Sequence, residues 1–167
     1  MTDKTNHPGG LNLTRRAVRL TGVFPPARVL DIGCGEGASV NFLKKLGYQA
    51  LGVSENAEKL PFDAETFEIA LFECVLSCIE NSEFALSEAF RVLKNDGVII
   101  ISDIFNRNFI GEFLEKLKNC GFEAFFTEDH TPALVTYFAE LREFPRETYY
   151  SGNLENTGYF LILGRKI

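Results

Sequence analysis

A short apolar strand that leads into three alternating glycines constrains this chain more than any other feature. The stretch runs from Val29 to Gly37 and reads VLDIGCGEG. Residues 28–32 are predicted to form a buried strand, and the pattern from about residue 37 to 46 predicts a helix directly after the glycines. Glycine lets the backbone approach a ligand closely, and the unpaired N–H groups at a helix start attract an anion. Because a plain strand-to-helix turn needs fewer glycines, the loop predicts a ligand site after this strand.

The rest of the chain alternates between strand-like and helix-like segments. Further strands are predicted at residues 48–53, 67–72, 98–102, 122–127 and 159–163, and further helices at 13–21, 81–93, 110–120 and 131–141. Thr14 is a candidate cap of the first helix, and Asp96-Gly97 is the predicted turn before strand 98–102. This alternation is typical of an α/β fold with a doubly wound, mostly parallel sheet.

The acidic balance of the sequence argues against nucleic-acid partners. The formal net charge is −6, whereas affinity for nucleic acid is carried largely by Lys and Arg. The opening residues MTDKTNHPGG lack the apolar core of a signal peptide, and no apolar run approaches the roughly 20 residues of a membrane helix. The four cysteines form no C-x-x-C pair, so reduced thiols and no metal site are expected. We therefore expect a cytoplasmic protein without a nucleic-acid or membrane partner.

Two families of cofactor fit the glycine loop by itself. Gly33-x-Gly35-x-x-Ala38 matches the dinucleotide fingerprint of nicotinamide oxidoreductases, but a lone match of this kind is weak. The wider sequence resembles the class I S-adenosylmethionine-dependent methyltransferases, and the small type 11 group among them. The similar segments are VLDIGCGEG, NAEKLPF at 56–62, TFEIALF at 66–72 and EAFRVLKNDGVIIISD at 88–103, in which Asn95-Asp96-Gly97 stands where Pro-Gly-Gly is usual. Their joint occurrence in the family's order, over about residues 10–105, favours this resemblance.

The resemblance implies a Rossmann-like methyltransferase fold with S-adenosylmethionine as cofactor. The methyl acceptor would be a small molecule or a protein side chain. The chain would form a single domain, 1–167, with an N-terminal helix or lid at 1–22, a cofactor-binding core at 28–105 and an acceptor side at 106–167. Asp31 would hold the cofactor's amino group, and Asn56 and Ala57 would face its adenine ring. The full set of implied cofactor-binding residues is Asp31, Gly33, Cys34, Gly35, Gly37, Ser54, Asn56, Ala57 and Glu73.

The sequence departs from the family pattern after the second strand. The family usually has an acid after Gly-Val that binds both ribose hydroxyls, but this chain has Ser54 there. Only Ser54 and Glu55 separate Val53 from NAEKLPF, whereas a parallel crossover needs a dozen or more residues. Either this protein lacks the usual crossover helix and next strand, or residues are missing between Val53 and Asn56. The first alternative leaves strand 48–53 at the sheet edge, and both predict that few residues enclose the adenine side.

No obligatory catalytic motif is expected, because methyl transfer from a sulfonium is a direct displacement that positioning accelerates. A base is needed only where the acceptor loses a proton, and the weak candidates are Glu73, Asp103 and His130. His7 is either part of an N-terminal lid or lies in a frayed terminus. Two alternatives to a methyltransferase remain. One is a degenerate member of the family that serves as a binding module, which Ser54 suggests because it replaces the usual acid. The other is an NAD-dependent oxidoreductase.

Overall fold

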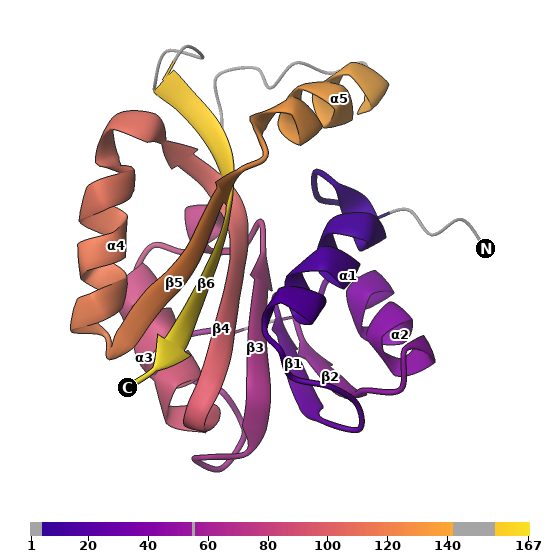
Figure 1. Cartoon of the computed structure of the whole chain (residues 1–167), viewed down its shortest axis with the longest axis vertical. Helices are drawn as coiled ribbons and strands as arrows, with labels where there is room; N and C mark the ends of the chain where they lie inside the picture. The colour runs from indigo at the N-terminus through magenta and orange to yellow at the C-terminus, as the bar shows by residue number, and fades with distance from the viewer. Residues whose placement is uncertain (1–4, 55, 142–155) are drawn as a thin grey trace.

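Six strands form one mixed sheet in the computed structural model, which describes residues 5–54, 56–141 and 156–167. The strand order is β2-β1-β3-β4-β6-β5 (Figure 1). The strands β1 to β4 pair in parallel, and β6 is antiparallel to both β4 and β5. The predicted doubly wound, mostly parallel α/β fold is therefore confirmed. The strands are β1 (Arg28–Ile32), β2 (Gln49–Val53), β3 (Phe67–Glu73), β4 (Leu93–Asn106), β5 (Phe122–Asp129) and β6 (Thr157–Lys166).

Helices cover both faces of the sheet. One face carries α1 (Gly10–Leu20), α2 (Ala38–Lys45) and α5 (Thr131–Leu141), and the other carries α3 (Ser82–Val92) and α4 (Ile110–Asn119) (Figure 1). Short 3-10 turns, η1 (Leu76–Cys78) and η2 (Arg107–Phe109), follow β3 and β4. None of the helices in the described part of the chain has both the length and the apolarity to span a bilayer.

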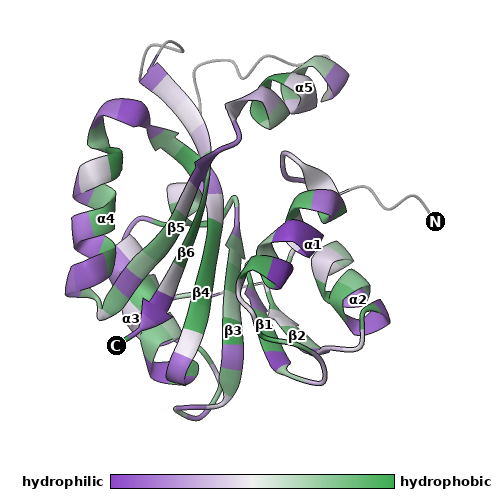
Figure 2. Cartoon of the chain, viewed as in Figure 1, coloured by the Kyte–Doolittle hydropathy of each residue, from purple (hydrophilic) through white to green (hydrophobic). Residues whose placement is uncertain are grey.

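The central strands are apolar on both sides because each sheet face is covered. In β3, Ala70 and Phe72 pack against α3 and α4, while Ile69 and Leu71 pack against the core under α1 and α2. All four side chains are fully buried. The hydropathy colouring in Figure 2 shows this as green strands between helices that are green on one side and purple on the other. A strand buried on both faces reads as a continuous apolar run, which is why these strands were recognisable in the sequence.

Two predicted local features are wrong. Thr14 does not cap the first helix, because α1 begins three residues earlier than residue 13, behind Gly9 with φ 77°. Asp96-Gly97 is an irregularity inside β4 and not a turn before it. Leu93 pairs with Phe67 and Val98 with Ile69, so β4 carries extra residues here, and Asp96 takes φ 61°.

The strand β2 lies at the edge of the sheet, as the short connection after Val53 predicted. Its register with β1 runs from Gln49 opposite Arg28 to Val53 opposite Ile32. No helix or strand lies between Val53 and Phe67 in the described residues of that connection. The alternative with missing residues predicts a break in the chain between Val53 and Asn56, and Glu55 at that place lies outside the described residues.

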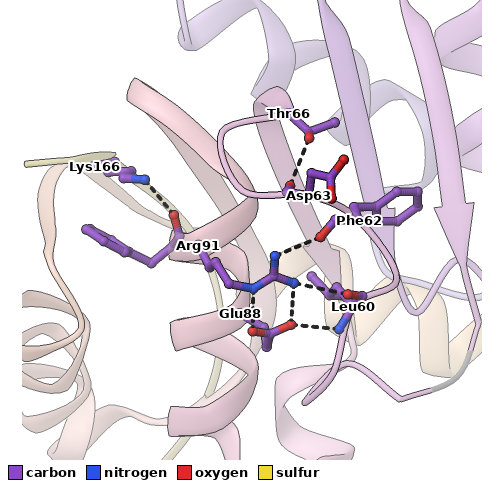
Figure 3. Close-up of polar contacts among 8 residues, drawn as sticks. Leu60, Phe62, Asp63, Thr66, Glu88, Arg91 and Lys166 are labelled. Carbon is purple, nitrogen blue, oxygen red and sulfur yellow. Dashed lines mark hydrogen bonds and ion pairs between the residues drawn. The ribbon is translucent and has the colours of Figure 1, made fainter.

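Side chains of α3 hold the connection that follows β2. The Arg91 guanidinium donates to the Phe62 carbonyl at 2.7 Å and to the Leu60 carbonyl at 3.0 Å (Figure 3). The Glu88 carboxylate accepts from the Leu60 N–H at 2.8 Å and is paired with Arg91. In Figure 3 both side chains reach from the helix to the same stretch of backbone. The Arg91–Glu88 clamp therefore positions the NAEKLPF segment without a neighbouring strand.

Candidate functional site

A hollow of about 80 Å³ opens beyond the carboxyl ends of β1 and β3. It lies at the edge of the parallel strands where open α/β sheets bind ligands. The contributing elements are the end of β1, the glycine loop, the first turn of α2, the last residue of β3 and the segment before α1. The lining residues are Thr5, Asn6, His7, Asp31, Gly33, Cys34, Gly35, Glu36, Ala38, Ser39 and Glu73.

The glycine loop adopts a backbone that other residues rarely take. Gly33, Gly35 and Gly37 have φ of 82°, 50° and 78°. The N–H groups of Gly33 and Cys34 donate to the Val53 carbonyl at 2.7 and 3.0 Å, which fixes the loop against the end of β2. A Cβ on Gly33 would lie 2.3 Å from a methyl group of Val75, whereas a Cβ on Gly35 would meet nothing within 4 Å. Packing therefore requires Gly33, while Gly35 leaves space open toward the hollow.

Asp31 presents a buried carboxyl to this hollow. Its residue is 3% exposed, and no residue in the described part of the chain donates a hydrogen bond to its side chain. Burial, and after it the nearby Glu73 carboxylate, together raise the pKa of Asp31 from 3.8 to about 8. A buried acid without a donor is costly, and a cationic donor compensates for that cost. The position is therefore suited to an ammonium group.

Glu73 ends β3 and faces the same hollow. Its side chain is 6% exposed. One carboxylate oxygen accepts from Thr14 Oγ1 at 2.7 Å, and the other accepts from Ser39 Oγ at 2.5 Å. His7 Nε2 lies 3.2 Å from the second oxygen. Glu73 thus joins α1, α2 and the N-terminal segment to the end of the sheet.

The structure brings five of the predicted cofactor-binding residues together and leaves four outside the hollow. Asp31, Gly33, Cys34, Gly35 and Glu73 line it, and Gly37, Ser54, Asn56 and Ala57 do not. Ser54 and Asn56 are exposed on the connection after β2, and Asn56 has φ 56°.

Two of the candidate bases lie elsewhere. Asp103 is fully buried and accepts from the Ser77 N–H and hydroxyl at 3.1 and 2.6 Å. Burial raises its pKa, which the hydrogen bonds from Ser77 oppose. His130 lies after β5, with Nε2 2.6 Å from Glu128, which also pairs with Arg16 of α1. Neither side chain lines the hollow.

Sequence reasoning missed the hydroxyls that orient Glu73. Thr14 lies on the buried face of α1, and Ser39 lies in the first turn of α2. The available signal was a polar residue at a buried helix position, since both residues are at most 5% exposed. Such a residue needs a hydrogen-bond partner, but the sequence does not say which one.

Comparison with known proteins supports the resemblance stated from the sequence. A family model described as a methyltransferase domain matches residues 53–101. The ubiquinone/menaquinone biosynthesis C-methyltransferase UbiE of Rhizobium johnstonii is 30% identical over 155 residues, which are 86% of this chain and 58% of that protein. The uncharacterized methyltransferase YodH of Bacillus subtilis is 30% identical over 118 residues, which are 56% of this chain and 50% of that protein. The chain thus spans between 50% and 58% of the length of these relatives.

Solved structures match the whole fold. Geranyl diphosphate C-methyltransferase from Streptomyces coelicolor, solved with S-adenosyl-L-homocysteine, superposes with a TM-score of 0.75 at 15% identity. The match covers 95% of this chain and 78% of that one. This likeness shows the fold. The sequence matches confirm the resemblance of the chain to the class I S-adenosylmethionine-dependent methyltransferase superfamily.

Proposed function

We propose that this chain binds S-adenosylmethionine in the hollow at the ends of β1 and β3 and transfers its methyl group to an acceptor. The observation that carries the proposal is Asp31, a buried carboxyl that accepts no hydrogen bond from the described residues and lies beside a glycine loop with open space. When bound, the cofactor supplies a methyl group on a positively charged sulfur, which an acceptor's lone pair displaces. UbiE, named as a C-methyltransferase, and YodH, named as a methyltransferase, support this assignment.

The residues of the hollow have distinct parts in this proposal. Asp31 accepts from the ammonium group of the cofactor's amino-acid end and balances its charge. Gly35 leaves room for that end to lie against the loop backbone. Glu73, oriented by Thr14 and Ser39, supplies a second negative charge beside it. Positioning of the two reactants then supplies most of the acceleration, as a direct displacement requires.

Calorimetric titration of the free protein tests this function. Micromolar binding of S-adenosylmethionine and S-adenosylhomocysteine is expected, with no heat from NAD. Asp31→Asn is expected to weaken binding of both ligands strongly, whereas Asp63→Asn, at an exposed acid outside the hollow, leaves it unchanged. Binding of NAD in place of the adenosyl ligands would select the oxidoreductase alternative.

A second candidate function is a binding module that has lost methyl transfer. Two observations favour it: Ser54 occupies the position where an acid usually binds the ribose, and the hollow does not extend to Asn56 and Ala57. This alternative predicts adenosyl-ligand binding weaker than millimolar. The same titration therefore separates the two functions.

A further inference from the structure

His7 lines the hollow but has no part in the proposed function. It is 7% exposed although it lies near the start of the chain, and it lines the hollow together with Thr5 and Asn6. Its Nδ1 lies 3.2 Å from the Pro8 carbonyl, which holds the ring in place. Its buried Nε2 makes no hydrogen bond with any described residue, although it lies 3.2 Å from a Glu73 oxygen. A residue that lines the hollow therefore holds a buried polar nitrogen without a hydrogen bond.

The charges around the hollow are unbalanced. Its described lining residues include the acids Asp31, Glu36 and Glu73, and none of them is Lys or Arg. Among the described residues that line the hollow, His7 alone can carry a positive charge. A ligand that ends in an amino acid brings a carboxylate as well as an ammonium group. The acids suit the ammonium group, and they would repel a carboxylate that had no donor of its own.

We propose that His7 recognises the α-carboxylate of the cofactor's amino-acid end, so that the N-terminal segment closes over the bound cofactor. The inference rests on the proposed function, since it assigns a second contact to the same ligand. Asp31 and His7 then divide the zwitterion between them, with the ammonium group on the acid and the carboxylate on the imidazolium. A doubly protonated ring donates from Nδ1 to Pro8 and from Nε2 to the ligand.

A ligand series tests the assignment without any methyl acceptor. The probes are S-adenosylhomocysteine, its decarboxylated analogue, which keeps the ammonium group, and methylthioadenosine, which lacks the amino-acid end. We expect His7→Phe to lower the affinity for S-adenosylhomocysteine about tenfold or more, as for a lost charged hydrogen bond. The affinity for each of the other two probes should fall less than about threefold. His7→Gln, which keeps one donor, should give an intermediate affinity. His130→Phe removes the only other imidazole of the chain and should change none of the three.

Hydrogen exchange gives a second readout that does not depend on the variants. The Gly10 N–H donates to the His7 carbonyl at 3.3 Å, so its protection reports on the closed N-terminal segment. S-adenosylhomocysteine should raise this protection in the unaltered protein, and the decarboxylated analogue should not. Equal protection by both ligands would contradict the proposal.

The possible results distinguish a failure of the His7 assignment from a failure of the proposed function. If the unaltered protein binds none of the three probes, the proposed function fails. If it binds them but His7→Phe weakens S-adenosylhomocysteine and its decarboxylated analogue equally, His7 only packs over the site and the inference is wrong. If His7→Phe changes neither affinity, the carboxylate is held by the backbone N–H groups at the start of α2, and the inference is also wrong.

Discussion

Replacing Asp31 by Asn should stabilise the free protein while it removes cofactor binding. The pKa of Asp31 is about 8 in the folded protein, against 3.8 for an ordinary aspartate. Between these values the folded state holds a proton that the unfolded chain has lost, so the free energy of unfolding falls as the pH rises. One pKa unit corresponds to about 1.4 kcal/mol, so this group should cost on the order of 3 kcal/mol between pH 5 and pH 7. Asn is neutral throughout and escapes that cost.

Urea unfolding followed by circular dichroism, at pH 5, 6 and 7, measures the effect. The stability of Asp31→Asn relative to the unaltered protein should rise by about 1.4 kcal/mol per pH unit across this range. Asp63→Asn, at an exposed acid, serves as the control and should show no such trend. A stability difference that stays flat with pH would show that Asp31 is ionised in the folded protein, and the argument from burial would fail.

Cofactor binding should depend on pH in the opposite sense, with affinity rising where the stability of the free protein falls. An ammonium group favours the ionised form of Asp31, so binding of S-adenosylhomocysteine must displace the proton that the free protein holds below pH 8. In His7→Phe, which has no titratable ring at this position, affinity should therefore increase from pH 6 to pH 8, and calorimetry in buffers of different ionisation enthalpy should detect proton release. His7→Phe combined with Asp31→Asn should show neither effect. Affinity of His7→Phe that does not change with pH would contradict a contact between Asp31 and the ammonium group.

Further predictions concern the loop and the connection after β2. Gly35→Val should abolish binding of S-adenosylhomocysteine in calorimetry and cost about 1–2 kcal/mol of stability, since φ is 50° and the added side chain enters the open space. Ser54→Asp should tighten that binding by roughly 1–2 kcal/mol if the residue lies beside the ribose, and a loss of affinity would place the ribose elsewhere. Arg91→Ala should lower the free energy of unfolding by about 2 kcal/mol, because the partly exposed guanidinium bonds two carbonyls and Glu88. A double-mutant cycle with Glu88→Gln should show coupling, and additive effects would contradict a joint clamp.

The strands and most helix boundaries could be predicted because their signals are local. The run RVLDI marks β1 at the residues where the structure has it, and Gly121 with φ 91° follows the end of α4. The glycine loop and Asp31 were likewise recognisable, since one short stretch contains both. These features need no knowledge of the tertiary structure.

The rest of the site depends on contacts between distant parts of the chain. A threonine before an apolar stripe usually caps a helix, which is what the sequence predicts for Thr14. Its hydroxyl instead donates to Glu73, 59 positions away. The Asp96-Gly97 pair has the composition of a turn, yet pairing with β3 keeps it inside a strand. His7 could equally have been frayed, and only the position of Glu73 explains its burial. Local pattern fixes which residues are polar or apolar, while their partners come from the topology.

The Arg91–Glu88 clamp leaves the edge of the sheet at β2 available for another strand. Because these two side chains of α3 anchor residues 60–62, the connection needs no pairing with β2 to hold its position. In the part of the chain that the structure describes, no strand pairs with the outer edge of β2, and such an edge can accept another strand. A strand-helix unit grafted at Ser54 would therefore add to the sheet without displacing any existing pair. The added unit would enclose the adenine ring of a bound cofactor. This junction is therefore the place at which to engineer tighter cofactor binding.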